Sequence, residues 1–159
     1  MRKKNYSALI VGGNLEMSKE DIENIISKKG LAEKVSVSGP RHEDEKYLTF
    51  LNADIFVFPT FYKNEAFPLV ILEAMQFELP VISTCEGAIP EIIDDGVNGF
   101  LVKRRSPNEI AAKLELLIKD PQLRRAMGGK GREKYLSNYT LSHFQNNMEK
   151  VFQEVLADH

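Results

Sequence analysis

The chain has 159 residues, 43% of them hydrophobic, which is the size and apolar content of one globular domain with a core of its own. Its 21 basic and 23 acidic residues leave a formal net charge of -2, and this balance lacks the basic excess that nucleic-acid-binding proteins carry. The single cysteine, Cys85, excludes an internal disulfide and favours a reducing cytoplasm.

The first predicted elements are a strand and a helix. Residues 7–11 (Ser-Ala-Leu-Ile-Val) are a short apolar run closed by residues 12–14 (Gly-Gly-Asn), so we expect a buried strand that ends in a turn. Ser18 can then cap a helix from Lys19 to about Lys29, with Asp21 as its capping-box partner.

A second strand and helix follow in the same order. The short apolar run at residues 35–37 predicts a strand that ends at Gly39-Pro40. The spacing of Tyr47, Leu48 and Leu51 then predicts a helix with an apolar stripe.

Three further strands are predicted, over residues 54–58, 80–83 and 99–102. A loop after Pro59 leads to a helix that Pro68 can open at its first position and that runs to about Phe77. A short helix near residues 90–93 separates the last two strands. Apolar strands joined by helices favour a parallel sheet covered on both faces. We therefore predict an α/β fold, a Rossmann-like doubly wound parallel sheet with C-terminal helices.

The last third of the chain is predicted to be helical. Ser106 and Pro107 provide a cap and a first-turn proline with Glu109 as the capping-box glutamate, and Asp120-Pro121 repeats the cap–proline signal. Thr140 can cap a final helix. The apolar residues of that helix recur at helical spacing and form a C-terminal stripe that needs a covering surface: Leu141, Phe144, Met148, Val151, Phe152 and Val155.

Two carboxylates lie around one predicted helix N-terminus, in the loop that follows residues 54–58. Sheets of this type bind ligands beyond the carboxyl ends of their strands. Glu65 precedes the helix opened by Pro68, and Glu73 lies five residues into it, roughly 7 to 8 Å along the axis. Backbone N–H groups and the positive dipole end of a helix bind phosphate without a basic side chain. A diphosphate therefore fits here, with sugar and ribose hydroxyls at the two glutamates.

The segment Glu65-Ala-Phe-Pro-Leu-Val-Ile-Leu-Glu73-Ala-Met resembles the E-x7-E motif of the family 4 (group 1) retaining glycosyltransferases. The flanking segments resemble the same family in order and spacing: residues 56–59, 79–82, 87–91 and 95–101. The resemblance covers roughly residues 7–137 and is to the C-terminal, donor-binding domain of a GT-B fold. It implies one nucleotide-sugar-binding domain over residues 1–159.

The resemblance also implies roles for single residues. Glu65, the catalytic candidate, would contact the donor sugar, and Glu73 would hold the ribose hydroxyls. The loop after the second strand would border the nucleobase, and the turn after the first strand is given at most a lining role. The donor-binding candidates besides Glu73 are therefore Ala66, Phe67, Pro68, Leu69, Gly39, Pro40, Arg41, Gly12 and Gly13.

Two features depart from the family pattern. Ala66 and Pro68 stand where the motif often has glycine, although Phe67 and Leu69 still offer N–H groups. Nothing before Ser7 can supply the first strand of the family's domain, with its basic pair for the diphosphate, and the acceptor-binding N-terminal domain is absent too. The resemblance therefore implies either a fragment of a longer enzyme or an unusually truncated gene product, and we expect the 159-residue chain alone to transfer no sugar.

The expected activity is retaining hexosyl transfer from a UDP-, GDP- or ADP-sugar, in glycan or polysaccharide biosynthesis, with no metal ion and no other cofactor. One alternative is a non-catalytic nucleotide-binding or scaffold module with the same fold. A nicotinamide-dependent oxidoreductase is disfavoured, because Gly12 and Gly13 do not belong to a G-x-G-x-x-G pattern. The scattered histidines and the lone Cys85 favour structural roles over metal binding or catalysis.

Two further partners are expected at the surface. The C-terminal stripe favours self-association where the N-terminal domain does not cover it. No apolar run approaches the roughly 20 residues that cross a bilayer. Basic clusters such as residues 103–105 would allow only peripheral contact with anionic lipid, at the inner face of the membrane.

Overall fold

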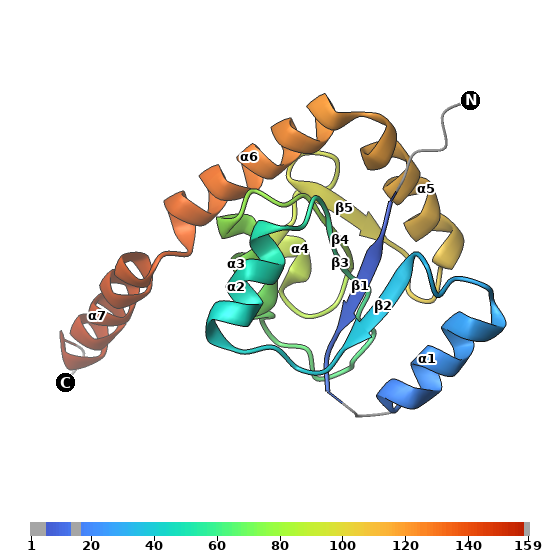
Figure 1. The fold of residues 1–159 in the computed structure, drawn as a ribbon. Helices are drawn as coiled ribbons and strands as arrows, with labels where there is room; N and C mark the ends of the chain where they lie inside the picture. The colour runs from blue at the N-terminus through green and yellow to red at the C-terminus, as the bar shows by residue number, and fades with distance from the viewer. Residues whose placement is uncertain (1–5, 14–16, 158–159) are drawn as a thin grey trace. The chain divides into compact units, whose positions relative to one another are not determined.

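The computed structural model describes residues 6–13 and 17–157 (Figure 1). Asn14 of the predicted turn and His159 lie outside this range. The chain divides into two compact units, Met1–Thr49 and Phe50–His159. No helix in the described ranges has the length and apolar content that a membrane span requires.

The first unit is a parallel strand pair with a crossover helix. Strand β1 (Ala8–Val11) pairs with β2 (Val35–Ser38), with Val11 opposite Ser38, and helix α1 (Lys19–Lys28) connects them. The predicted capping box is confirmed: Ser18 Oγ accepts from the Asp21 N–H at 3.1 Å, and the Asp21 carboxylate accepts from the Ser18 N–H at 3.1 Å. The local sequence therefore determines where α1 begins.

Burial in this part of the chain differs from the prediction. All four residues of β1 are exposed, so the expected buried strand is wrong. Strand β1 is exposed because this sheet has only two strands in the described ranges and its helix, α1, packs against β2. Helix α2 (Glu43–Leu51) forms as predicted, but Tyr47, Leu48 and Leu51 are exposed on it and Phe50 is the buried residue.

The second unit contains a three-stranded parallel sheet in the order β3-β4-β5. Its strands are β3 (Phe56–Phe58), β4 (Val81–Thr84) and β5 (Gly99–Val102). Helices α3 (Leu69–Gln76) and α4 (Ile89–Ile92) join successive strands. The C-terminal helices are α5 (Pro107–Lys119), α6 (Pro121–Asn138) and α7 (Leu141–Ala157).

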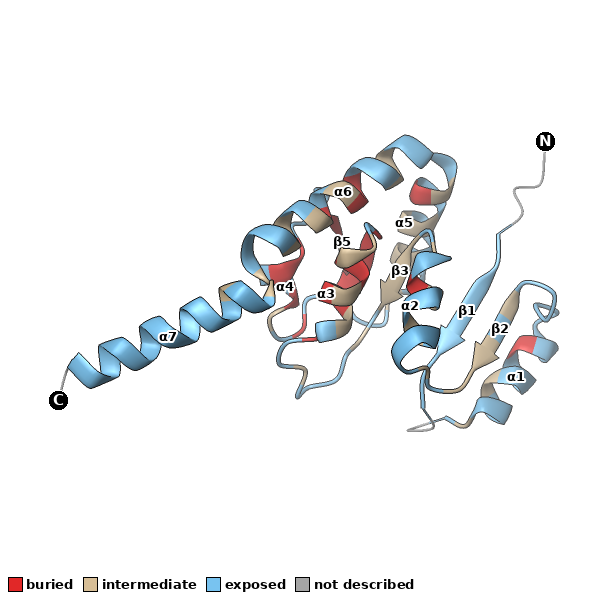
Figure 2. Ribbon diagram, turned by 60° about the vertical axis from the view of Figure 1, so that its left-hand side comes forward, coloured by how far each residue is buried: buried red, intermediate tan, exposed pale blue. Residues whose placement is uncertain are grey.

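Both faces of this sheet are covered, because side chains alternate along the central strand β4. Val81 belongs to one apolar cluster with residues of α3 and α4, such as Ile71 and Ile92. Ile82 belongs to a second cluster with Leu117 of α5 and Met127 of α6. Figure 2 shows the buried residues gathered around this sheet. The predicted α/β class with parallel strands between helices is confirmed.

The three C-terminal helices test three predicted caps. Asp120 Oδ1 accepts from the N–H of Leu123 at 2.9 Å, and Thr140 Oγ1 accepts from the N–H of His143 at 3.3 Å, so both caps are confirmed. The capping box of Ser106 is wrong, since its side chain makes no cap hydrogen bond. Glu109 instead accepts from the backbone N–H of Lys103 at 2.9 Å, and that bond lowers the pKa of Glu109.

The C-terminal stripe lies open on α7. No described residue of this helix is buried, and Leu141 and Phe152 are exposed by 71% and 60% (Figure 2). The predicted helix and its apolar face are present. The surface that covers this apolar face is not shown, and self-association through it stays a prediction.

Candidate functional site

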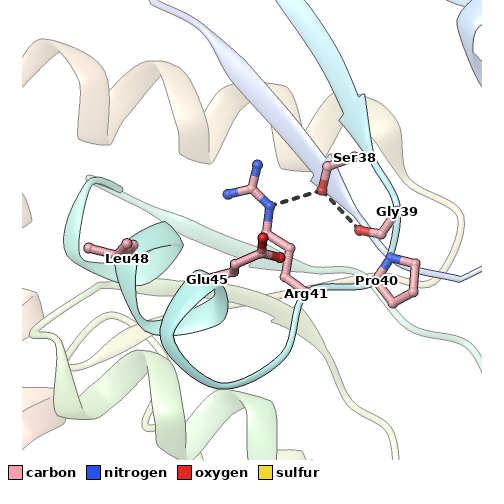
Figure 3. Close-up of a pocket in the computed structure, with 6 residues that line it drawn as sticks. All are labelled: Ser38, Gly39, Pro40, Arg41, Glu45 and Leu48. Carbon is pink, nitrogen blue, oxygen red and sulfur yellow. Dashed lines mark hydrogen bonds between the residues drawn. The ribbon is translucent and has the colours of Figure 1, made fainter.

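A hollow of about 380 Å³ opens beyond the end of β2 in the first unit (Figure 3). This volume falls in the roughly 300–1,000 Å³ range of small-molecule sites. The three residues predicted to border a nucleobase, Gly39, Pro40 and Arg41, all line it. Its other lining residues, which the sequence did not single out, are Ser38, Glu45 and Leu48.

Arg41 is held in place at this hollow by two hydroxyl groups. Its Nε donates to Ser38 Oγ at 3.1 Å, and its Nη1 donates to Thr49 Oγ1 at 2.6 Å. Each hydroxyl directs its own proton to a backbone carbonyl: Ser38 to Gly39 at 2.9 Å, and Thr49 to Glu45 at 2.7 Å. The oxygen lone pairs are therefore left to accept from Arg41, and the guanidinium orientation is fixed before any ligand binds.

Gly12 and Gly13 follow the neighbouring strand end. Because Val11 pairs with Ser38, the residues after β1 and those after β2 leave the sheet at the same edge. Both glycines are exposed, and a Cβ added to either would meet no atom within 4 Å. Packing therefore does not require glycine at these two positions in the described structure, and their lining role stays a prediction.

The loop that carries Glu65 belongs to the second unit and is fixed by its backbone. The Glu65 N–H donates to the Tyr62 carbonyl at 3.1 Å, and the Ala66 carbonyl accepts from the Ala88 N–H at 2.9 Å. Gly87 lies against the same segment with a φ of +49°, and a Cβ on it would stand 1.9 Å from the Glu65 carbonyl oxygen. Gly87 thus permits the close contact that positions Glu65, a role not predicted from the sequence.

The N-terminus of α3 follows directly. Pro68 is its N-cap rather than its first helical residue, so the predicted start is early by one position, and the proline gives no side-chain cap. The first turn has no acidic residue. Among the described residues the N–H groups of Leu69 and Val70 have no hydrogen-bond partner, whereas the Ile71 N–H donates to the Pro68 carbonyl at 3.1 Å. This helix end therefore keeps its donors and its positive dipole end for a ligand.

The two predicted glutamates flank this helix end. Glu65 is half-buried in the loop before it, and Glu73 is half-buried on α3 itself. Glu73 lies four positions after Leu69, a rise of about 6 Å along the axis. Phe67 and Leu69 are exposed at 39% and 66%, so the helix end is open to solvent. The segment from Glu65 to Glu73 thus places one half-buried carboxylate before and one after a helix N-terminus that is open to solvent.

An ion pair between a buried carboxylate and an exposed arginine supports the neighbouring loop after β4. Glu86 is only 3% exposed, and both of its carboxylate oxygens accept from the Arg104 guanidinium. Since this carboxylate is neutralised by Arg104, it adds little negative charge to the loop. In the part of the chain that the structure describes, no cluster of three or more His, Cys, Asp or Glu side chains could hold a metal ion.

Comparison with known proteins matches these features to one family. The family model of glycosyl transferases group 1 matches residues 1–134. The capsular polysaccharide biosynthesis glycosyltransferase CapM of Staphylococcus aureus is 31% identical, over 98% of this chain and 40% of its own length. The chain spans two fifths or less of the length of the curated relatives that it matches.

Two solved structures show the same fold. The C-terminal domain of a glycosyl transferase group 1 family protein, LpcC, from Francisella tularensis has a TM-score of 0.75 at 31% identity, over 88% of this chain and 73% of that one. HepE of Anabaena has a TM-score of 0.83 over 94% of this chain and 41% of its own, and its 22% identity supports the fold alone. The chain belongs to the glycosyl transferases group 1 family.

Proposed function

We propose that this chain binds a nucleoside-diphosphate sugar and supplies the donor side of a retaining glycosyl transfer within a longer protein. Family membership supports the reaction class, since the matched relatives are named glycosyltransferases. A nucleoside diphosphate as ligand is supported by the neighbour HepE, which has been solved in complex with UDP. The longer protein is supported by the share of its relatives that this chain spans.

The observation that carries the proposal is the open N-terminus of α3 with a glutamate on each side. The Leu69 and Val70 N–H groups have no partner among residues 6–13 and 17–157. No carboxylate in the first turn neutralises the positive end of the helix dipole. A diphosphate bound there would gain charge-assisted hydrogen bonds from the backbone. Glu73 would then accept from the ribose hydroxyls, and Glu65 from hydroxyls of the sugar.

The proposed chemistry is mainly electrostatic. As the bond between the anomeric carbon and the diphosphate breaks, negative charge develops on the leaving oxygen, and the α3 N-terminus stabilises that charge. Glu65 orients the sugar for attack by the acceptor on the face that the diphosphate leaves. No metal ion takes part in this scheme, and a cytoplasmic location with peripheral membrane contact remains the expectation.

Removing the ribose contact is the first test. We expect Glu73→Ala to weaken binding of nucleoside diphosphates by about 1 to 3 kcal/mol, because it removes hydrogen bonds to a charged group. Isothermal titration calorimetry of the 159-residue chain with GDP, UDP and ADP measures this loss. Glu115→Ala, an exposed helical glutamate whose ion pair contributes little, is the matched control. If the two variants bind equally well, Glu73 does not hold the ribose.

The sugar contact is tested in the longer protein. We expect Glu65→Gln to lower turnover more than nucleotide affinity, since the carboxylate faces the sugar and the charge on it is what the substitution removes. Steady-state kinetics and nucleotide titration of the same preparation give the two quantities. Equal losses of UDP or GDP affinity and of turnover would contradict the assignment of Glu65 to the sugar.

A further inference from the structure

The hollow at the end of β2 offers one donor group and one acceptor group to a ligand. Arg41 Nε and Nη1 are engaged by Ser38 and Thr49, while Nη2 has no hydrogen-bond partner among the described residues. The Glu45 carboxylate lines the same hollow and likewise has no ion-pair or hydrogen-bond partner in the described ranges (Figure 3). The guanidinium can only donate, and the ionised carboxylate can only accept.

The rest of the hollow suits a flat ring. Pro40 and Leu48 contribute apolar surface to its lining, and Leu48 is 56% exposed when the hollow is empty. Small-molecule sites commonly combine such apolar contacts with a few fixed polar groups that set orientation. A planar heterocycle can therefore cover the apolar side chains while its edge meets Arg41 and Glu45.

From this arrangement we infer that the hollow binds the base of a nucleotide and selects guanine; the inference rests on the proposed function. Guanine presents N7 and O6 as adjacent acceptors, which an arginine guanidinium recognises. Its N1–H and N2–H donate in parallel, which matches the two oxygens of one carboxylate. The Watson–Crick edge of guanine, with O6 as acceptor and N1–H and N2–H as donors, thus uses the donor of Arg41 and both acceptors of Glu45.

The other bases match this pair of side chains less well. Uracil has a single N–H between two carbonyl oxygens, so a carboxylate that accepts from it also meets the lone pairs of its neighbours. Adenine offers acceptors at N1 and N7 but only its amino group as a donor, which leaves one Glu45 oxygen without a ring N–H. HepE binds UDP, but its likeness at 22% identity supports the fold alone. The choice of base therefore depends on Arg41 and Glu45.

Competing titrations of the 159-residue chain with GDP, UDP and ADP test the inference. We expect GDP to bind at least about tenfold more tightly than either alternative, the scale of one good bidentate base contact. Glu45→Gln should lose about tenfold in GDP affinity, because its amide replaces one acceptor oxygen with an NH2 donor that faces a guanine donor, and should change UDP affinity by less than about twofold. Asp44→Asn is the matched control, since this acid is in the same first turn but does not line the hollow.

The outcomes separate the two proposals. If UDP or ADP binds as tightly as GDP, the guanine inference is overturned while the proposed function stands. GDP preference that survives Glu45→Gln would overturn the assignment to this hollow. Failure of all three nucleotides to bind, with the chain shown to be folded by circular dichroism, would overturn the proposed function and the inference together. A melting curve for each variant excludes loss of fold as the cause of lost binding.

Discussion

Replacement of Gly87 by alanine is expected to lower the free energy of unfolding by about 3 kcal/mol and to weaken nucleotide binding more than about tenfold. A left-handed backbone conformation costs a non-glycine residue about 1–2 kcal/mol, and Gly87 has a φ of +49°. Its new Cβ would also stand 1.9 Å from the Glu65 carbonyl oxygen and 2.7 Å from that of Ala66, so the loop must move. Overpacking of this kind typically costs about 1–3 kcal/mol.

Gly96→Ala separates these two costs. Gly96 has a φ of +79°, but a Cβ there would meet no atom within 4 Å. This variant should therefore lose only about 1–2 kcal/mol and keep its affinity for nucleoside diphosphates. Urea denaturation and calorimetric titration give both quantities. If Gly87→Ala behaves like Gly96→Ala in both measurements, contact with Gly87 does not position the loop that leads into α3.

Gly128→Ala is expected to destabilise the second unit by about 3 kcal/mol through a different contact. Gly128 is buried on α6, and a Cβ on it would stand 1.8 Å from the carbonyl oxygen of Glu78, just beyond the end of α3. The Arg132 guanidinium on the same helix donates to the Gln76 carbonyl of α3, and this hydrogen bond opposes movement of α6 away from α3. The two helices must separate to admit the methyl group, which strains a well-packed core.

Gly129→Ala is the matched control for Gly128→Ala. It changes the adjacent residue of the same helix, and its Cβ would meet no atom within 4 Å. Alanine is favoured over glycine in a helix interior by about 0.8–1.0 kcal/mol, so this variant should be unchanged or slightly more stable. Urea denaturation measures both variants. Equal stability of the two would show that α6 does not approach α3 as closely as the structure has it.

Local elements were predictable because their signals lie within a few residues. Ser18 with Asp21 and Asp120 before Pro121 fix helix starts through side-chain contacts over two or three residues. The strand and helix periods along the second unit likewise predict its parallel sheet, with Val81 and Ile82 facing opposite clusters. For these groups the partner lies within a few residues and no other group competes for it, so the sequence alone is sufficient.

Predictions that depended on distant partners were less accurate. The exposure of β1 depends on what covers its faces, which its own apolar pattern does not reveal. Glu109 bonds to Lys103 instead of forming a capping box with Ser106, because the end of β5 offers a competing N–H. In both cases a tertiary or neighbouring contact overrides the local signal.

The candidate site shows the same division. Glu65, Glu73 and the Gly39–Arg41 loop were named from a contiguous motif and from strand ends, and their roles remain predictions. Glu45 and Gly87 were not named as site residues, because their importance comes from what the fold brings near them. Glu45 lines the hollow beside Arg41, and Gly87 contacts the backbone of Glu65.

The central claim is that a diphosphate binds at the N-terminus of α3. Two-dimensional 15N NMR of the 159-residue chain, 18.1 kDa in mass, tests it most directly during titration with GDP. We expect the amide signals of Phe67, Leu69 and Val70 to shift the most and to saturate together, since those N–H groups would meet the phosphate oxygens. Saturable shifts confined to other residues, with these three amides unmoved, would contradict the claim.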